Sequence, residues 1–323
     1  MSKHWVDYER LIKAVILKDL PKAILSDISL ETKKYIKKTS PGLWQKTYRS
    51  ALNELEQHVP EKWRREFIES IETAKDDSLE GSIVAFSDLY SAYKECEVNQ
   101  RIFGEYYNET FLELEESLYN DYDAGIFNAF LNNQRLQAYM VQIRTLLSSV
   151  RWNQINRNVK STVAGHTYFV TFMAILLTYI SKTVTKTPLN CEETLLKAAY
   201  HDVPESITGD IISPTKRRIQ GFENTISQVE EQMVDEKLIH LLPGGIQEDL
   251  KRYMLLPFEG EGGRLVKAAD LFGSLYECLI EMNTGNAYPL FKTAYRDIMR
   301  ELKMMKTQEV DYIIKWGIVG NSA

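Results

Sequence analysis

The sequence predicts an all-α fold built as two helical units, and three observations support this. Apolar residues recur three and four positions apart along nearly the whole chain, which is the spacing of one helix face, and no segment alternates as a strand does. Of the 323 residues, 44% are hydrophobic and 26% are charged, with 16 Gly and 9 Pro. This composition is typical of a globular protein with a packed core. The length favours two domains over one.

Two segments of the first half recur in the second half with almost the same offset, 183 and then 182 residues. Internal repeats of this kind indicate two related structural units. We therefore expect units at about 1–141 and 142–323, the first of them lacking a counterpart of residues 142–183. The aligned pairs are Ala14 with Lys197, Asp19 with Asp202, Asp27 with Asp210, Gly81 with Gly263 and Asp88 with Asp270.

A long apolar helix is predicted from Tyr168 to Lys182, directly after His166. Its apolar run ends at Ile180, is interrupted by Thr171 and Thr178 and is too short to cross a bilayer, so we expect a buried core helix and no membrane association.

The next helix should begin at Asn190, because this residue is a good N-cap and an acidic residue follows three positions later. It should run to about Asp202. Turns are predicted around residues 242–245 and 262–263, and the second turn precedes a helix that carries Asp270.

Charge and cysteine usage exclude several classes of function. The net charge is −6, and no basic residue lies between Arg101 and Arg135. Because nucleic-acid binding needs Lys and Arg to neutralise phosphates, no nucleic-acid partner is expected. Three cysteines without close spacing favour reduced thiols, and the N-terminus shows no apolar signal segment, so a cytoplasmic protein is expected.

The strongest chemical signal is the adjacent pair His201-Asp202 at the end of a helix that looks buried. Imidazole and carboxylate donors suit Mn, Co, Fe, Zn or Ni. The pair alone is weak evidence, but His166 lies upstream beside a glycine, and Asp270 lies in an otherwise apolar helix, where an unpaired carboxylate is costly to bury. These residues are therefore candidates for one metal site.

The order of these residues resembles the HD-domain phosphohydrolase superfamily, and within it the bacterial 5′-deoxynucleotidase branch. That branch has an Arg-Trp pair fifteen residues before its first His, and here Arg151-Trp152 stands fifteen residues before His166. The similarity covers about residues 145–300 and, more faintly, 14–100. The residues that carry it are His166, His201-Asp202, Glu205, Thr208-Gly209-Asp210 and Leu265-Val-Lys-Ala-Ala-Asp270.

The resemblance implies a role for each residue. The metal ligands, for Mn, Co, Fe, Zn, Ni or Mg, would be His166, His201, Asp202 and Asp270. Glu205 would orient the attacking water or carry its proton, and the alternative is a solvated surface carboxylate.

Three further residues would bind the substrate. Arg151 would grip the phosphate and Trp152 would form a wall against the sugar, although a plain core aromatic is an open alternative. Asp210 would reach a sugar hydroxyl or the water, unless it is only a helix cap. Lys160 and Lys216 are weaker phosphate candidates.

The first unit resembles a truncated, degenerate HD-like copy. Lys18 and Lys22 stand at the positions of His201 and Glu205, and His166 has no equivalent. We expect this unit to be catalytically inactive and, because the branch tends to form dimers, to complete an internal pseudo-dimer; a homo-oligomer stays open. The second unit departs from the family too, since Gly165 precedes His166 where an acidic residue is usual.

The expected function is hydrolysis of a nucleotide phosphate by metal-activated water, with a 5′-deoxynucleoside monophosphate as the preferred substrate. One alternative is a triphosphate or pyrophosphate hydrolase of the same superfamily, which would need more basic residues near the site. The other is a metal-binding regulatory module without turnover.

Overall fold

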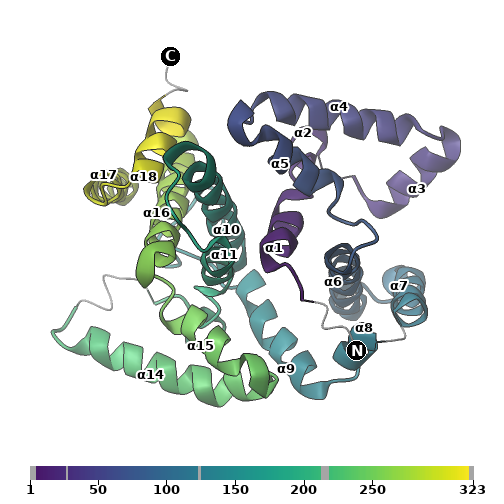
Figure 1. Ribbon diagram of the computed structural model, residues 1–323. Coiled ribbons are helices and arrows are strands. Elements are labelled where there is room, and N and C mark those ends of the chain that lie inside the picture. The colour runs from purple at the N-terminus through teal and green to yellow at the C-terminus, as the bar shows by residue number, and fades with distance from the viewer. Residues whose placement is uncertain (1–4, 27, 123–124, 212–217, 320–323) are drawn as a thin grey trace. The chain divides into compact units, whose positions relative to one another are not determined.

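The computed structural model describes residues 5–26, 28–122, 125–211 and 218–319 (Figure 1). These residues form helices joined by turns, and their only strand-like feature is one antiparallel bridge between Val150 and Thr162. The predicted all-α class is confirmed. The chain divides into two compact units, residues 1–129 and 130–323, and the repeat-based boundary after residue 141 stays a prediction. Asp27 and Lys216 lie outside the described residues.

The first unit is built around α1, which packs against α5 and α6. Ala14, Ala74 and Val84 form a buried cluster between these elements. Its helices are α1 Tyr8–Leu17, α2 Lys22–Leu25, α3 Leu30–Thr39, α4 Leu43–Gln57, α5 Glu61–Glu72, α6 Leu79–Phe103, α7 Asn108–Asp121 and α8 Gly125–Leu131, which crosses into the second unit.

The second unit has α10 and α16 at its centre, with α11 packed on both of them and α17 covering α16. Its helices are α9 Gln134–Ile143, α10 Val163–Ile180, α11 Cys191–Tyr200, α12 Glu205–Thr208, α14 Phe222–Lys237, α15 Gln247–Leu255, α16 Gly260–Asn283, α17 Pro289–Met304 and α18 Gln308–Ile313.

Helix α10 begins earlier than expected. Thr162 is its N-cap and accepts a hydrogen bond from the Gly165 N–H at 3.1 Å, so His166 lies in the first turn of the helix and not before it. Together with the π-helical turn that follows, the helix runs to Thr185. By length and apolar composition this helix is long enough to cross a membrane. The prediction that its apolar run is too short to do so is therefore wrong. Most of it is buried against α11 and α16, so it is the core helix of this unit.

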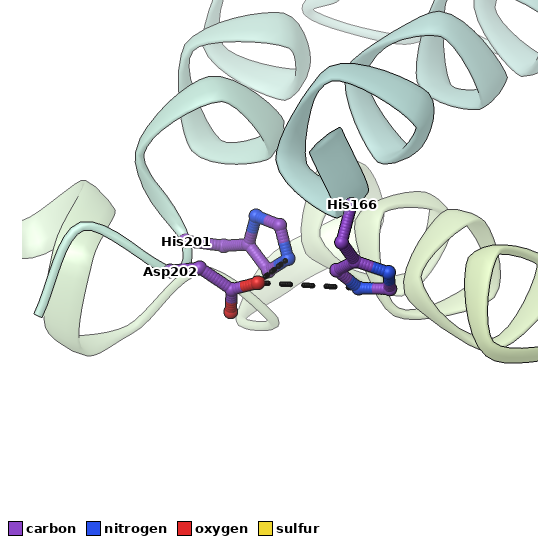
Figure 2. A group of neighbouring side chains, drawn as sticks. All are labelled: His166, His201 and Asp202. Atoms are coloured by element: carbon purple, nitrogen blue, oxygen red, sulfur yellow. Dashed lines mark ion pairs between the residues drawn. The ribbon is translucent and has the colours of Figure 1, made fainter. Parts of the chain in front are cut away.

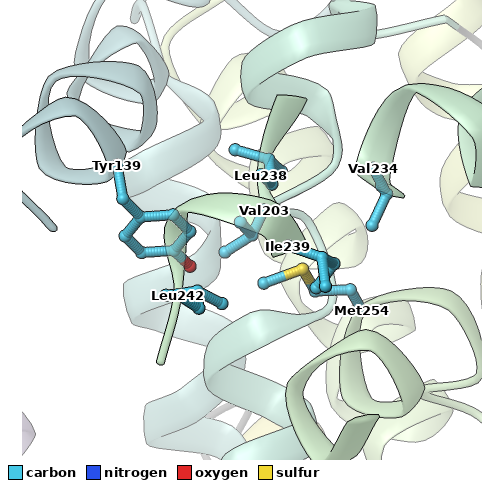
Figure 3. Packing of buried hydrophobic residues seen from close by; sticks show 7 residues of the cluster. All are labelled: Tyr139, Val203, Val234, Leu238, Ile239, Leu242 and Met254. Carbon is cyan, nitrogen blue, oxygen red and sulfur yellow. The ribbon is translucent and has the colours of Figure 1, made fainter. Parts of the chain in front are cut away.

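A second apolar cluster holds the turn that follows α11 (Figure 3). Val203 in this turn is buried among side chains from α9, α14, α15 and the segment between the last two. Because Val203 directly follows Asp202, its packing fixes the backbone that carries the metal-site candidates. The cluster comprises Tyr139, Val203, Val234, Leu238, Ile239, Leu242 and Met254.

Candidate metal and phosphate site

His166, His201 and Asp202 come together as predicted (Figure 2). Each offers one ligand atom, and these atoms lie within 4.8 Å of one another. Both histidines are buried, with 3% and 7% of their surface exposed. His201 is the C-cap of α11, which ends at Tyr200 and not at Asp202, so the His-Asp pair lies in the tight turn that follows.

The ring of His201 is oriented by its own helix. Its Nδ1 lies 2.8 Å from the Ala198 carbonyl oxygen, and an Nδ1–H donor there leaves Nε2 with a lone pair. Nε2 lies 3.1 Å from Asp202 Oδ2, and neither atom has a hydrogen-bond partner among the described residues. At this distance the two atoms can share a proton, or they can bind one divalent cation together. The donor set therefore fits a divalent metal.

Burial alone would lower the pKa of His201, but the Asp202 carboxylate raises it to about 9. Burial would raise the pKa of Asp202, and the His201 ring holds it below its usual range. Both shifts have one physical cause, which is that the site stabilises positive charge beside the carboxylate.

Asp270 on α16 lies against the same group but outside the set of three. Its Oδ1 is 3.2 Å from His166 Nε2, and its Oδ2 accepts a hydrogen bond from Lys267 Nζ at 3.0 Å. Burial opposes ionisation, but the His166 and Lys267 contacts hold the pKa of Asp270 well below its usual range. All four predicted ligands are thus neighbours, although Asp270 is shared with a lysine.

Gly273 makes room for His166 and was not identified from the sequence. A Cβ at this position would lie 2.8 Å from His166 Cε1 and 3.1 Å from Nδ1. A side chain at position 273 would therefore displace the imidazole. Gly273 lies three residues after Asp270, one helical turn along the same face, which is the signal that could have marked it.

Glu205 begins α12, one turn beyond the His-Asp pair. Its Oε2 is buried without a hydrogen-bond partner among the described residues. Burial and the carboxylates of Asp202 and Asp210 raise the pKa of Glu205 to about 9. A carboxyl group perturbed in this way beside a metal site is a candidate acid or base. Asp210 follows Gly209, and burial also raises the pKa of Asp210, opposed by Arg151 and the Trp152 N–H.

Arg151 and Trp152 are both held by Glu277, a second residue that sequence reasoning missed. Glu277 accepts hydrogen bonds from Arg151 Nε at 3.2 Å, Trp152 Nε1 at 2.8 Å and Ser161 Oγ at 2.7 Å. Its Oε1 also lies 3.9 Å from His166 Nδ1. Glu277 is one heptad after Asp270 on α16, so the two acids share a helix face.

Trp152 has an unusual backbone. Its φ is 55°, in the left-handed region that a tryptophan rarely occupies. The indole contacts Phe291 at 5.8 Å between ring centroids as well as donating to Glu277. These contacts and the bridge of Val150 to Thr162 hold the strained turn.

The Arg151 guanidinium interacts electrostatically with several acidic side chains. Burial would lower its pKa, but Glu277, Asp202, Asp270 and Asp210 raise it. The guanidinium therefore lies in the electrostatic field of the carboxylates at the candidate metal site, and its phosphate-binding role stays a prediction. Lys160, the weaker candidate, is exposed.

Comparison with known proteins identifies the family. A family model described as "5′-deoxynucleotidase YfbR-like" matches residues 1–133 and 138–318. A 5′-deoxynucleotidase of Pectobacterium atrosepticum is 30% identical over 186 residues, which are 57% of this chain and 90% of the relative. A 5′-deoxynucleotidase of Yersinia pestis is 31% identical over 166 residues, 51% of this chain and 82% of the relative.

Among solved structures, an HD-domain phosphohydrolase from Listeria innocua is similar in fold. It has a TM-score of 0.53 and 22% identity, and the match covers 58% of this chain and 88% of that one. Family match, relatives and fold agree with the geometry of the His-Asp group. The chain belongs to the YfbR-like 5′-deoxynucleotidase family and is an HD-domain phosphohydrolase.

Proposed function

We propose that the second unit hydrolyses the phosphate ester of a 5′-deoxynucleoside monophosphate, with a divalent cation held by His166, His201, Asp202 and Asp270. The observation that carries the proposal is the convergence of one ligand atom each from His166, His201 and Asp202 to within 4.8 Å of one another. A bound dication would supply a water of lowered pKa and would polarise the phosphoryl group.

The other residues have distinct proposed tasks. Glu205 orients the attacking water or carries its proton on the buried Oε2. Arg151 binds the phosphate, while Glu277 fixes the guanidinium through Nε. Asp210 lies beside the Trp152 backbone N–H, and we assign it to a sugar hydroxyl or to the water. Trp152 forms the wall against the sugar.

A phosphate-release assay on the full chain tests this function. With Mn or Co added, we expect inorganic phosphate from deoxynucleoside monophosphates and much less from the matching ribonucleotides and triphosphates. Triphosphates as the best substrates would favour the rival hydrolase. Bound metal without phosphate release from any nucleotide would favour a regulatory module.

We further propose that the first unit is a degenerate copy of the second. Helices α1 and α2 have the same bounds as α11 and α12 once the offset of 183 is applied. Ser26, after α2, has φ 63° and ψ 172°, and Gly209, after α12, has φ 74° and ψ 166°. A left-handed serine where the other unit has glycine supports common descent, because serine seldom adopts this conformation unaided.

The glycines near the start of α6 and α16 support the same proposal. A Cβ on Gly81 would clash with the backbone of Asp76, and a Cβ on Gly263 would clash with the backbone of Phe258. Each glycine thus faces the residue five positions before it, in the same type of turn.

The first unit has a lysine where the metal ligand is expected. Lys18, at the position of His201, forms ion pairs with Asp19 and, at 3.1 Å, with Asp88 Oδ1. These two carboxylates occupy the positions of Asp202 and Asp270. The ammonium group supplies the positive charge that a cation would supply, so we propose that this unit has no turnover and serves as the internal partner of a pseudo-dimer.

A further inference from the structure

The two ring nitrogens of His166 have different surroundings. Its Nε2 lies 3.2 Å from Asp270 Oδ1 and 3.9 Å from Asp202 Oδ2, so this is the nitrogen that would bind the proposed cation (Figure 2). The other nitrogen, Nδ1, is buried and has no hydrogen-bond partner among the described residues. A histidine that binds a metal usually directs its second ring N–H to a carboxylate, a carbonyl oxygen or water. In His201 that partner is the Ala198 carbonyl.

Glu277 is the acidic residue that lies beside Nδ1 of His166. Its Oε1 is 3.9 Å away, which makes the contact electrostatic and not a hydrogen bond. A negative charge on this side favours a proton on Nδ1 and leaves the lone pair on Nε2, the form that a metal ligand needs. The preceding residue, Gly165, has no side chain to supply such a charge. Glu277 therefore takes for His166 the place that the Ala198 carbonyl takes for His201.

The same carboxylate holds the residues proposed to bind the substrate. It accepts hydrogen bonds from Arg151 Nε at 3.2 Å and from Trp152 Nε1 at 2.8 Å. Ser274, one turn earlier on α16, accepts from Arg151 Nη2 at 3.4 Å. Glu277 is itself buried, so its charge acts on these neighbours with little screening by water. One side chain thus contacts a proposed metal ligand, the proposed phosphate-binding group and the proposed sugar wall.

We propose that Glu277 is a positioning residue that aligns the metal ligand His166 with the phosphate-binding residue Arg151. Beside Nδ1 it sets the tautomer of the imidazole, and through Nε it fixes the plane of the guanidinium. Because both groups contact one carboxylate on a rigid helix, the distance between cation and phosphate is set by α16. This inference rests on the proposed function, since it takes His166 as a metal ligand and Arg151 as the group that meets the phosphate.

The affinity of the full chain for Mn tests the contact with His166. Glu277→Gln removes the charge and keeps the size of the side chain and one acceptor oxygen, whereas Glu277→Asp keeps the charge. The matched control is Glu281→Gln, which removes another buried charge from the same helix, one that pairs with Arg157. Protein treated with EDTA and dialysed is titrated with Mn in a calorimeter. Circular dichroism melting checks that each variant folds.

We expect Glu277→Gln to bind Mn about tenfold more weakly or worse, as for other changes in groups that support metal ligands. Glu277→Asp should regain part of this loss, and Glu281→Gln should bind Mn like the wild type. Equal losses in Glu277→Gln and Glu281→Gln would show a merely structural role and overturn the inference. Wild-type Mn affinity in Glu277→Gln would overturn it as well.

The split between KM and kcat tests the contact with Arg151. With dAMP as the substrate and Mn at saturation, we expect Glu277→Gln to raise KM about tenfold or more and to change kcat less, because binding of the phosphate is weakened. An unchanged KM would overturn the proposed alignment. If the wild type binds Mn and releases no phosphate, the proposed function fails, while the Mn affinity of Glu277→Gln still decides this inference.

Discussion

The two histidines of the candidate metal site are held in different ways. His201 is oriented by a hydrogen bond to the Ala198 carbonyl within its own helix. His166 is oriented by packing, because its ring lies in the space left by the absent side chain of Gly273. A metal site is only as well defined as the groups that hold its ligands.

Gly273→Ala should therefore impair metal binding although no proposed ligand is itself substituted. The new Cβ would lie 2.8 Å from His166 Cε1, so the ring must move. We expect metal affinity to fall by roughly tenfold or more, as for other changes in groups that support metal ligands. Metal content after dialysis measures it. Gly244→Ala is the control, because a Cβ there meets nothing within 4 Å; equal loss in both variants would contradict the role of Gly273.

Glu205→Ala should separate chemistry from metal binding. Its buried carboxyl lies beside the site but outside the group of three ligands. We expect turnover to fall by about 100-fold or more, as for removal of a general acid or base, with metal content unchanged. Asp202→Ala should lose both. Full activity of Glu205→Ala, in the phosphate-release assay, would show that its role is misassigned.

At the scale of elements, α16 organises the site through a row of acids on one face. Asp270 meets His166, Glu277 holds Arg151, and Glu281 receives the backbone N–H groups of residues 158 and 159 at 2.9 and 3.0 Å. The side chain of Glu281 is fully buried and also pairs with Arg157 Nε at 3.2 Å. The helix thereby fixes the loop between the Arg-Trp pair and α10.

Glu281→Gln should destabilise the second unit, because it removes one partner of a buried ion pair. Such changes cost about 3–5 kcal/mol. Urea unfolding measures the loss, and Glu261→Gln, an exposed acid on the same helix, is the control. An equal change in both variants would contradict the buried role.

The same residue predicts how stability depends on pH. Burial would raise the pKa of Glu281, but the backbone N–H groups of Asn158 and Val159 lower it below the ordinary value of 4.5. A carboxyl with a depressed pKa stabilises the folded state above its unfolded pKa, and this contribution is lost as the pH falls through the folded pKa. Unfolding measured below pH 4.5 should therefore show a weaker acid dependence in Glu281→Gln than in the wild type.

Sequence patterns predicted the helices that carry the proposed ligands. They missed the residues that position the side chains of the site. The capping pattern at Asn190 predicted the start of α11 correctly, because N-caps act locally. Glu277 and Gly273 act through contacts with residues more than a hundred positions away, which a local pattern does not contain. The positive φ of Trp152 is likewise imposed by its tertiary contacts. The start of α10 was placed too late, because the Thr162 cap was not used.

At the scale of the whole molecule, the reactivity of the three cysteine thiols tests the packing of both units. Cys96, Cys191 and Cys278 are all buried, and none of them forms a disulfide. Burial raises the pKa of the Cys278 thiol to about 12, which suppresses its reactive thiolate. We expect the native chain to resist alkylation by iodoacetamide and the urea-unfolded chain to take up three groups, as measured by mass spectrometry. Rapid labelling of the native chain would contradict this packing.

The proposed pseudo-dimer also makes a prediction for the intact chain. If the first unit takes the place of a second subunit, the surface used for dimerisation is already covered, so the chain should sediment as a monomer of 37.4 kDa. Sedimentation equilibrium measures the mass. A dimer that withstands dilution would contradict the proposal.

Because of Lys18, the two units differ in how their clustered carboxylates are neutralised. Its ammonium group is attached to the chain and cannot be removed by dialysis or exchanged for another ion. The charge balance of Asp19 and Asp88 is therefore permanent, whereas the cation proposed beside Asp202 can be exchanged with the solution. A chelator should thus lower the melting temperature of one half of the polypeptide and leave the other half untouched.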